Sequence, residues 1–148
     1  MFPIDSQVIS IITKLIEEAQ RALQVKAYLS VIFLCGSVLE GALLGAAQKN
    51  PSKFNRSSSS PKDTNGNIKQ FHCWSLSAFI DVSCDIEILS LNIKKFSHNL
   101  RDFRNYIHPY QQLQSKFTPD ENTAKICFQV LKAALSDLQK SNREAANR

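Results

Sequence analysis

The chain has 148 residues, of which 43% are hydrophobic and 21% are charged, and this is the composition of a single soluble globular domain spanning residues 1–148. The net charge of +5 suits an anionic partner such as RNA but does not identify one. The four cysteines are scattered and form no CxxC pair, which excludes a disulfide framework and indicates the reduced thiols of a cytoplasmic protein. The N-terminus has no basic region ahead of an apolar core, so we expect no signal peptide.

The first predicted helix spans residues 1–24, with Asp5 or Ser6 as its cap. Its apolar residues recur at helical spacing and are expected to face the core. These residues are Val8, Ile11, Ile12, Leu15, Ile16, Ala19 and Leu23.

Residues 28–47 form the most hydrophobic run, which is apolar nearly all round and is therefore either the central helix of a bundle or a membrane span. Glu40 lies near the middle of this run, and a carboxylate at the centre of a bilayer costs roughly 3 kcal/mol. We therefore predict a buried bundle helix and no membrane partner. A buried carboxylate needs a partner, and we hypothesise that Glu40 pairs with Arg101 or Arg104. The alternative is that Glu40 lies at the rim of the bundle and meets water.

Residues 50–74 are expected to form a long, basic, serine-rich loop, because they contain two prolines, four consecutive serines and an Asn-Gly turn signal. Such a loop could hold an RNA backbone, or it could be a solvated insertion. The sequence His72-Cys73-Trp74 lacks a second pair of ligands, so no metal site is predicted. We expect Trp74 to anchor the return of the loop to the core.

The remaining helices have recognisable beginnings. Ser75 is the predicted cap of a third helix, and a fourth is expected to start near Ser90 or Asn92. Thr118 and Glu121 form a capping box before the last helix, and residues 142–148 are expected to fray. No stretch alternates like a strand. The prediction is an all-α, up-and-down bundle of about five helices.

The stretch from Phe96 to Tyr110 is predicted to be one helix that stops at a proline. Arg101, Arg104 and His108 would form a polar stripe along it, because residues four or seven positions apart share a helix face. His108 would then lie near the helix C-terminus, where the dipole favours its protonated form. A histidine that moves protons beside arginines that hold a phosphate is a catalytic arrangement. The alternative is a solvated face or a set of salt bridges. Beside the polar stripe, the predicted apolar stripe consists of Ile93, Phe96, Leu100, Phe103 and Ile107.

The segment LRDFRNYIHPY resembles the signature of the HEPN superfamily, in which an arginine precedes a histidine with four to six residues between them. Arg101 and His108 enclose six residues, and Asn105 supplies the polar residue that commonly follows an arginine there. Arg104 and His108 enclose only three, so the spacing leaves open which arginine belongs to the motif. An upstream phrase, GSVLEGALL, is also similar to one found in HEPN-like bacterial proteins, so the resemblance covers most of the chain.

This resemblance implies a HEPN-like helical fold and a symmetric homodimer with a composite site. The implied activity is metal-independent endoribonuclease cleavage without a cofactor, in a toxin–antitoxin or phage-defence setting. His108 would be the general acid/base, Arg101 with Arg104 would bind the phosphate, and Asn105 would orient either group. Tyr110 stands in a His-x-Tyr pattern that some HEPN toxins carry, in which a partner nucleotidyltransferase acting as antitoxin modifies the tyrosine.

Two alternatives remain open from the sequence. The first is a non-catalytic HEPN-like module that binds RNA, nucleotide or a protein partner. The second is a purely structural role, in which Arg101, Arg104 and His108 tie helices together.

Overall fold

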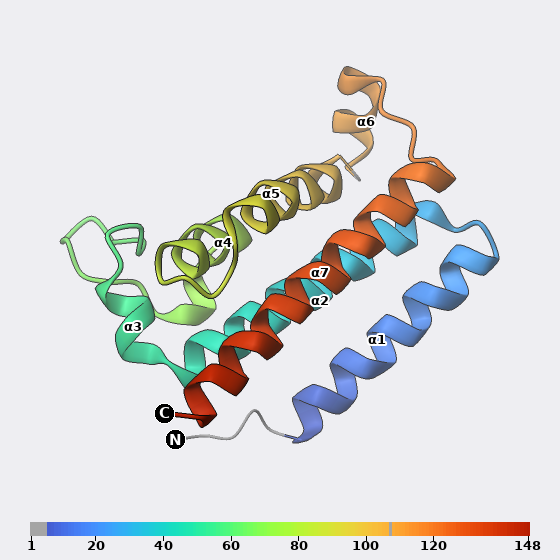
Figure 1. Cartoon of the computed structure of the whole chain (residues 1–148). Coiled ribbons are helices and arrows are strands. Elements are labelled where there is room, and N and C mark those ends of the chain that lie inside the picture. Colours follow the sequence, from blue (N-terminus) through green and yellow to red (C-terminus); the bar gives the residue numbers. More distant parts are fainter. Residues whose placement is uncertain (1–5, 107) are drawn as a thin grey trace.

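The computed structural model describes residues 6–106 and 108–148, and in these residues it contains α-helices, one 3₁₀ turn and no strand. The predicted all-α class is confirmed (Figure 1). The helices are α1 (Ser6–Gln24), α2 (Tyr28–Lys49), α3 (Pro51–Arg56), the 3₁₀ turn η1 (Phe71–Cys73), α4 (Leu76–Asp85), α5 (Leu91–Asn105), α6 (Pro109–Ser115) and α7 (Glu121–Ala146).

The described residues thus hold seven α-helices, where about five were expected. The two that the sequence did not predict, α3 and α6, have six and seven residues. Both begin with a proline, whose fixed φ suits the first turn of a helix. Prolines that were taken as helix breakers therefore also start new helices.

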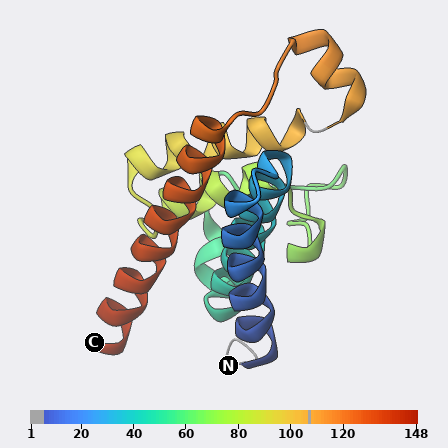
Figure 2. The same ribbon diagram turned by 90° about the vertical axis from the view of Figure 1, so that its right-hand side faces the viewer.

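Helix α2 is the centre of the fold and packs against α1, α3, α4, α5 and α7. The long helices α1, α2 and α7 lie side by side (Figure 1). Helix α5 packs against α2 and α7 and is inclined to α7, as Figure 2 shows. The predicted central bundle helix is confirmed by the burial of five large aliphatic side chains and of Cys35 along α2. Its fully buried residues include Val31, Ile32, Cys35, Val38, Leu39 and Leu43. Among the described residues, α2 is also the one helix long and apolar enough to cross a membrane.

Helix α1 differs from its prediction in what it buries. Ala19 is buried, but Val8 and Ile11 are 37% and 56% exposed. The reason is that α1 packs mainly on one neighbour, α2, with α7 as a minor second contact. The predicted cap of α1, Asp5 or the side chain of Ser6, lies outside the part of the chain that the structure describes.

The segment 50–74 was expected to be an irregular loop, and residues 57–70 have no helix or strand, but a helix and a 3₁₀ turn lie on either side of them. It contains α3, η1 and a single bridge between Lys62 and Ile68. The Trp74 side chain is buried and its indole N–H donates to the carbonyl of Lys69 at 2.8 Å, so the predicted anchor is confirmed. Aromatic side chains form the core of this segment, namely Phe54, Phe71, Trp74 and Phe79.

The hydroxyls of Ser57 and Ser59 fix the segment to α4 by donating to the Asp85 carboxylate. These bonds lower the pKa of Asp85, with the Ser59 bond as the main cause. Two of the four serines in the run are therefore hydrogen-bond donors to α4.

The other predicted helix ends are partly correct. Ser75 and Ser90 cap α4 and α5 by accepting from the backbone N–H groups of Ala78 and Ile93, as expected. The predicted capping box of Thr118 and Glu121 is wrong: the last helix begins at Glu121, and its cap is Asp120, whose carboxylate accepts from the backbone N–H of Thr123. Helix α7 continues to Ala146, so most of the tail that was expected to fray is helical. Good helix formers occupy that tail, which accounts for the continuation.

Candidate functional site

The signature stretch is broken between α5 and α6, so the prediction of one helix from Phe96 to Tyr110 is wrong. Helix α5 ends at Asn105, and His108 is the N-cap of α6, in extended backbone with ψ of 130°. The physical reason is Pro109, which disfavours helical geometry in the residue before it. Arg101 and His108 therefore belong to different helices, and their predicted two-turn alignment is lost. Ile107, the last member of the predicted apolar stripe, lies outside the described residues.

His108 lies at the start of α6, so its predicted position near a helix C-terminus is wrong. Its Nδ1 accepts a hydrogen bond from the backbone N–H of Tyr110 at 3.3 Å, so this nitrogen carries no proton in the observed arrangement. The proton of the neutral ring is then on Nε2. The side chain is exposed, so the imidazole is accessible to a ligand.

Arg104 and Glu40 form the ion pair that the sequence suggested. The Arg104 Nη1 donates to Glu40 Oε2 at 2.9 Å, with the two side chains 26% and 44% exposed. The pair joins the last turn of α5 to the middle of α2. Glu40 is also 44% exposed, so it lies at the rim of the bundle. The predicted pairing with an arginine and the alternative of a solvent-exposed rim position are therefore both partly correct.

Gly36 creates the space that Arg104 occupies. A Cβ placed on Gly36 would lie 2.6 Å from Arg104 Cδ and 3.3 Å from its Cγ. Gly36 and Glu40 are one helical turn apart, so they present the same face of α2 to α5. The aliphatic part of Arg104 crosses α2 over Gly36, and its guanidinium reaches Glu40.

Arg101 points elsewhere, towards α4. Its Nη2 and Nε donate to Asp102 Oδ1 at 2.6 and 3.1 Å, and its Nη1 donates to Ser77 Oγ at 2.7 Å. All three nitrogens of this guanidinium are thus engaged within the chain. The two arginines that the sequence placed on one stripe therefore serve different neighbours.

An open cavity of about 320 Å³ lies at the junction of α5 and α6. Its lining is polar and consists of Asp102, Asn105, Tyr106 and Gln111. Asn105, the predicted orienting residue, is exposed there. Tyr110 is 60% exposed on α6.

A cluster between α4 and α5 was missed by sequence reasoning. Asp81 Oδ1 lies 2.7 Å from His98 Nε2 and 3.5 Å from Lys94 Nζ. The signal was present in the sequence: Ser77, Asp81 and Asp85 repeat every four residues on α4, and α5 repeats basic residues at Lys94, His98 and Arg101. Two complementary polar stripes at helical spacing predict a polar helix–helix seam.

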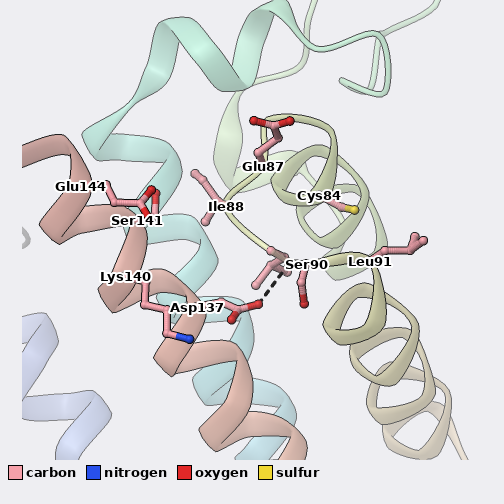
Figure 3. Close-up of a pocket in the computed structure, with 10 residues that line it drawn as sticks. Cys84, Glu87, Ile88, Ser90, Leu91, Asp137, Lys140, Ser141 and Glu144 are labelled. Carbon is pink, nitrogen blue, oxygen red and sulfur yellow. Dashed lines mark hydrogen bonds between the residues drawn. The ribbon is translucent and has the colours of Figure 1, made fainter.

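A cavity near the N-terminal end of α5 and the C-terminal part of α7 does not suit a phosphate. It measures about 500 Å³ and lies between the α4–α5 connection and α7 (Figure 3). Three acids and one lysine line it, and Asp137 accepts a hydrogen bond from the backbone of Ser90 at 3.0 Å. The excess of carboxylates disfavours an anionic ligand, so we place the candidate site at the α5–α6 junction.

Comparison of the chain with family models, curated proteins and solved structures gives no match.

Proposed function

We propose that the chain is a HEPN-like, metal-independent endoribonuclease whose site is shared between two copies. The observation that carries the proposal is the contact of Arg104 with Gly36 and Glu40. Gly36 and Glu40 belong to the phrase GSVLEGALL, and Arg104 belongs to FRNYIHP, so the two phrases of the resemblance meet at one place. A resemblance in two separate segments is more informative when those segments touch.

In this proposal Arg104, rather than Arg101, binds the scissile phosphate. Asp102 and Ser77 engage all three nitrogens of Arg101, whereas Glu40 engages one terminal nitrogen of Arg104. The remaining N–H groups of Arg104 can donate to phosphate oxygens, and Glu40 fixes the direction in which they point. Arg104 and His108 enclose three residues, which departs from the four to six of the motif.

His108 moves the protons of the reaction. The 2′-hydroxyl of the ribose loses its proton to the imidazole as its oxygen attacks the adjacent phosphorus. The P–O5′ bond breaks as the imidazolium so formed gives the proton to the leaving oxygen. The products are a 2′,3′-cyclic phosphate end and a 5′-hydroxyl end. Arg104 stabilises the additional negative charge of the transition state, and Asn105 donates a further hydrogen bond.

The alternative is a non-catalytic HEPN-like module that binds RNA, nucleotide or a protein partner. The specific observation in its favour is that both arginines already have carboxylate partners within the chain. On the basis of the resemblance, we also propose that the protein acts in a toxin–antitoxin or phage-defence system. In this proposal a nucleotidyltransferase modifies Tyr110.

The test is cleavage of RNA in the presence of a chelator by the wild-type protein, by His108→Ala and by His72→Ala. His72 is an exposed histidine on η1, away from the α5–α6 junction, and serves as the matched control. We expect wild type and His72→Ala to cut RNA to cyclic phosphate ends and His108→Ala to lose at least about 100-fold of the rate. RNA binding without cleavage by the wild type would favour the alternative. Equal cleavage by all three proteins would contradict the role of His108.

A further inference from the structure

The cavity at the α5–α6 junction has a lining suited to a nucleobase rather than to a phosphate. Asp102, Asn105, Tyr106 and Gln111 supply a carboxylate, two amides and a phenol ring, and no arginine or lysine is among the described residues that line it. Asp102, Asn105 and Tyr106 occupy positions i, i+3 and i+4, so they share one face at the C-terminal end of α5. Hydrogen bonds to the edge of a base and stacking on its face are the contacts by which proteins bind an unpaired base.

The ring of Tyr106 is held in place by two other aromatic rings. Its centroid lies 5.4 Å from that of Phe117, and Phe117 stacks on Phe103 at 5.4 Å with an interplanar angle of 20°. Phe117 belongs to the connection between α6 and α7, so this packing ties the connection to α5. A ring that is already ordered loses little conformational entropy when a base stacks on it.

Asp102 keeps one carboxylate oxygen for a ligand. The Nε and Nη2 of Arg101 both donate to Oδ1, and no hydrogen bond to Oδ2 is present among the described residues. An ionised carboxylate has about four acceptor sites, so Oδ2 retains about two of them. Arg101 also donates to Ser77, so this anchored guanidinium fixes the direction of the Asp102 carboxylate.

Two free acceptor sites match the edge of guanine better than that of the other RNA bases. Guanine has two adjacent donors, N1–H and the N2 amino group. Adenine and cytosine place a ring acceptor beside their amino group, and the N–H of uracil lies between two carbonyls. A carboxylate therefore attracts guanine and repels the acceptors of the other bases. The amide of Gln111 can donate to the guanine O6.

We infer that this cavity binds guanine and that the chain cuts RNA on the 3′ side of an unpaired guanosine. This inference rests on the proposed function and names its substrate. His108 is the N-cap of α6 and Gln111 is the third residue of that helix, and side chains at these two positions lie close together. The ribose of the bound guanosine then lies beside His108.

The bond changes are those of the proposed reaction, now assigned to one nucleotide. The 2′-hydroxyl of the bound guanosine gives its proton to His108 and attacks the 3′-phosphate of the same guanosine. The O5′ of the next nucleotide leaves with the proton that His108 returns. The products are a guanosine 2′,3′-cyclic phosphate end and a 5′-hydroxyl end.

Binding of uncleavable oligonucleotides tests the pocket without the reaction. The probe is a short, fluorescent uridine oligonucleotide with one central 2′-deoxyguanosine, and its affinity for the wild-type protein is measured by anisotropy. Hypoxanthine in place of guanine removes only the N2 amino group, whereas 7-deazaguanine keeps both donors. We expect hypoxanthine or adenine to weaken binding by about tenfold or more and 7-deazaguanine to leave it unchanged. Equal binding of guanine, hypoxanthine and adenine overturns the inference.

Variants assign the preference to the pocket. Asp102→Asn should bind the guanine and hypoxanthine probes almost equally, because its charged acceptor is gone. Glu144→Gln is the matched control, since it removes an exposed carboxylate from the C-terminal part of α7. Gln111→Leu changes an exposed residue of α6 and should weaken both probes by the same factor, because both bases keep O6. Unchanged helical circular dichroism verifies the fold. Full discrimination by Asp102→Asn overturns the inference.

Cleavage separates this inference from the proposed function. On an RNA with one guanosine among the other three bases, the wild type should make one cut, which leaves a guanosine cyclic phosphate end. Guanine-selective binding without cleavage would retain the pocket and refute the enzyme. Cleavage after every base at similar rates would retain the enzyme and refute the pocket.

Discussion

Glu40 and Arg104 form an ion pair of 2.9 Å across the contact between α2 and α5. The pair depends on a third residue, Gly36, since only a residue without a side chain leaves room for the aliphatic part of Arg104. Helix α2 thus positions Arg104 in two ways: Glu40 accepts a hydrogen bond from its guanidinium, and Gly36 leaves room for its aliphatic part.

Gly36→Ala should separate stability from activity. The added Cβ would displace Arg104, whose side chain is flexible enough to move, while the exchange of glycine for alanine favours an α-helix by up to about 1 kcal/mol. We expect a thermal midpoint close to that of the wild type and a loss of RNA cleavage of about tenfold or more. Gly41→Ala is the control, because a Cβ there meets only Ile12 Cδ1, at 3.9 Å. Full activity of Gly36→Ala would show that the position of Arg104 is unimportant.

Removal of the Glu40 charge should cost little stability. The Glu40 and Arg104 side chains are 44% and 26% exposed, and solvent-accessible ion pairs contribute about 0–1 kcal/mol. Chemical denaturation of Glu40→Gln, Arg104→Gln and the double variant should give a coupling free energy below about 1 kcal/mol. RNA cleavage by Glu40→Gln should nevertheless fall, since Arg104 loses its orienting partner. A coupling of several kcal/mol would instead make the pair a structural tie.

Thiol reactivity should divide the cysteines into two groups. Burial and the neighbouring Cys127 raise the pKa of Cys35 to about 12, and burial raises the pKa of Cys127 to about 11. At pH 8 a thiol reagent should modify Cys73 rapidly and Cys84 more slowly, and it should reach Cys35 and Cys127 only after unfolding. Rapid modification of all four in the native protein would contradict the burial of α2 against α7.

The same pKa values make the protein sensitive to alkali. The unfolded thiols ionise near pH 9.0, whereas the folded ones do so about two to three pH units higher. Their contribution to the free energy of unfolding is therefore complete below pH 9 and decreases as the pH rises towards the folded values. Denaturation curves between pH 8 and 11 in urea measure this decrease.

Ser97→Ala should leave stability unchanged or raise it by up to about 1 kcal/mol. Ser97 is fully buried in α5, and its hydroxyl has no hydrogen-bond partner among the described residues. Alanine removes this unsatisfied group and favours the helix. Urea denaturation gives the change, and a loss of more than 1 kcal/mol would reveal a buried partner such as a water molecule.

The sequence was sufficient to predict the all-α class, the central helix α2 and the caps Ser75 and Ser90, because these depend on local spacing and on single hydrogen-bonding side chains. It also predicted an acid–arginine pair, since a lone glutamate in an apolar helix needs a partner. It did not predict α3 or α6, because a proline can end one helix and begin the next, and local patterns do not decide between the two.

The candidate site was harder to predict than the fold. The stripe of Arg101, Arg104 and His108 assumed a continuous helix, and the break at His108 removed that assumption. The choice between the two arginines depended on partners that are distant in the sequence, namely Glu40 and Ser77. The separation of Glu40 from Arg104 by 64 residues shows why spacing within one segment was insufficient.

The most direct test of a shared site mixes two inactive chains. In the proposed dimer, each of the two sites combines Arg104 of one copy with His108 of the other. Arg104→Ala and His108→Ala are each expected to lose RNA cleavage, because each substitution removes one of these residues from both sites. In a mixture that exchanges subunits, the hybrid dimer contains one site with both Arg104 and His108, so cleavage should return to a substantial fraction of the wild-type rate. A mixture that stays as inactive as either variant alone, despite demonstrated subunit exchange, would contradict the account.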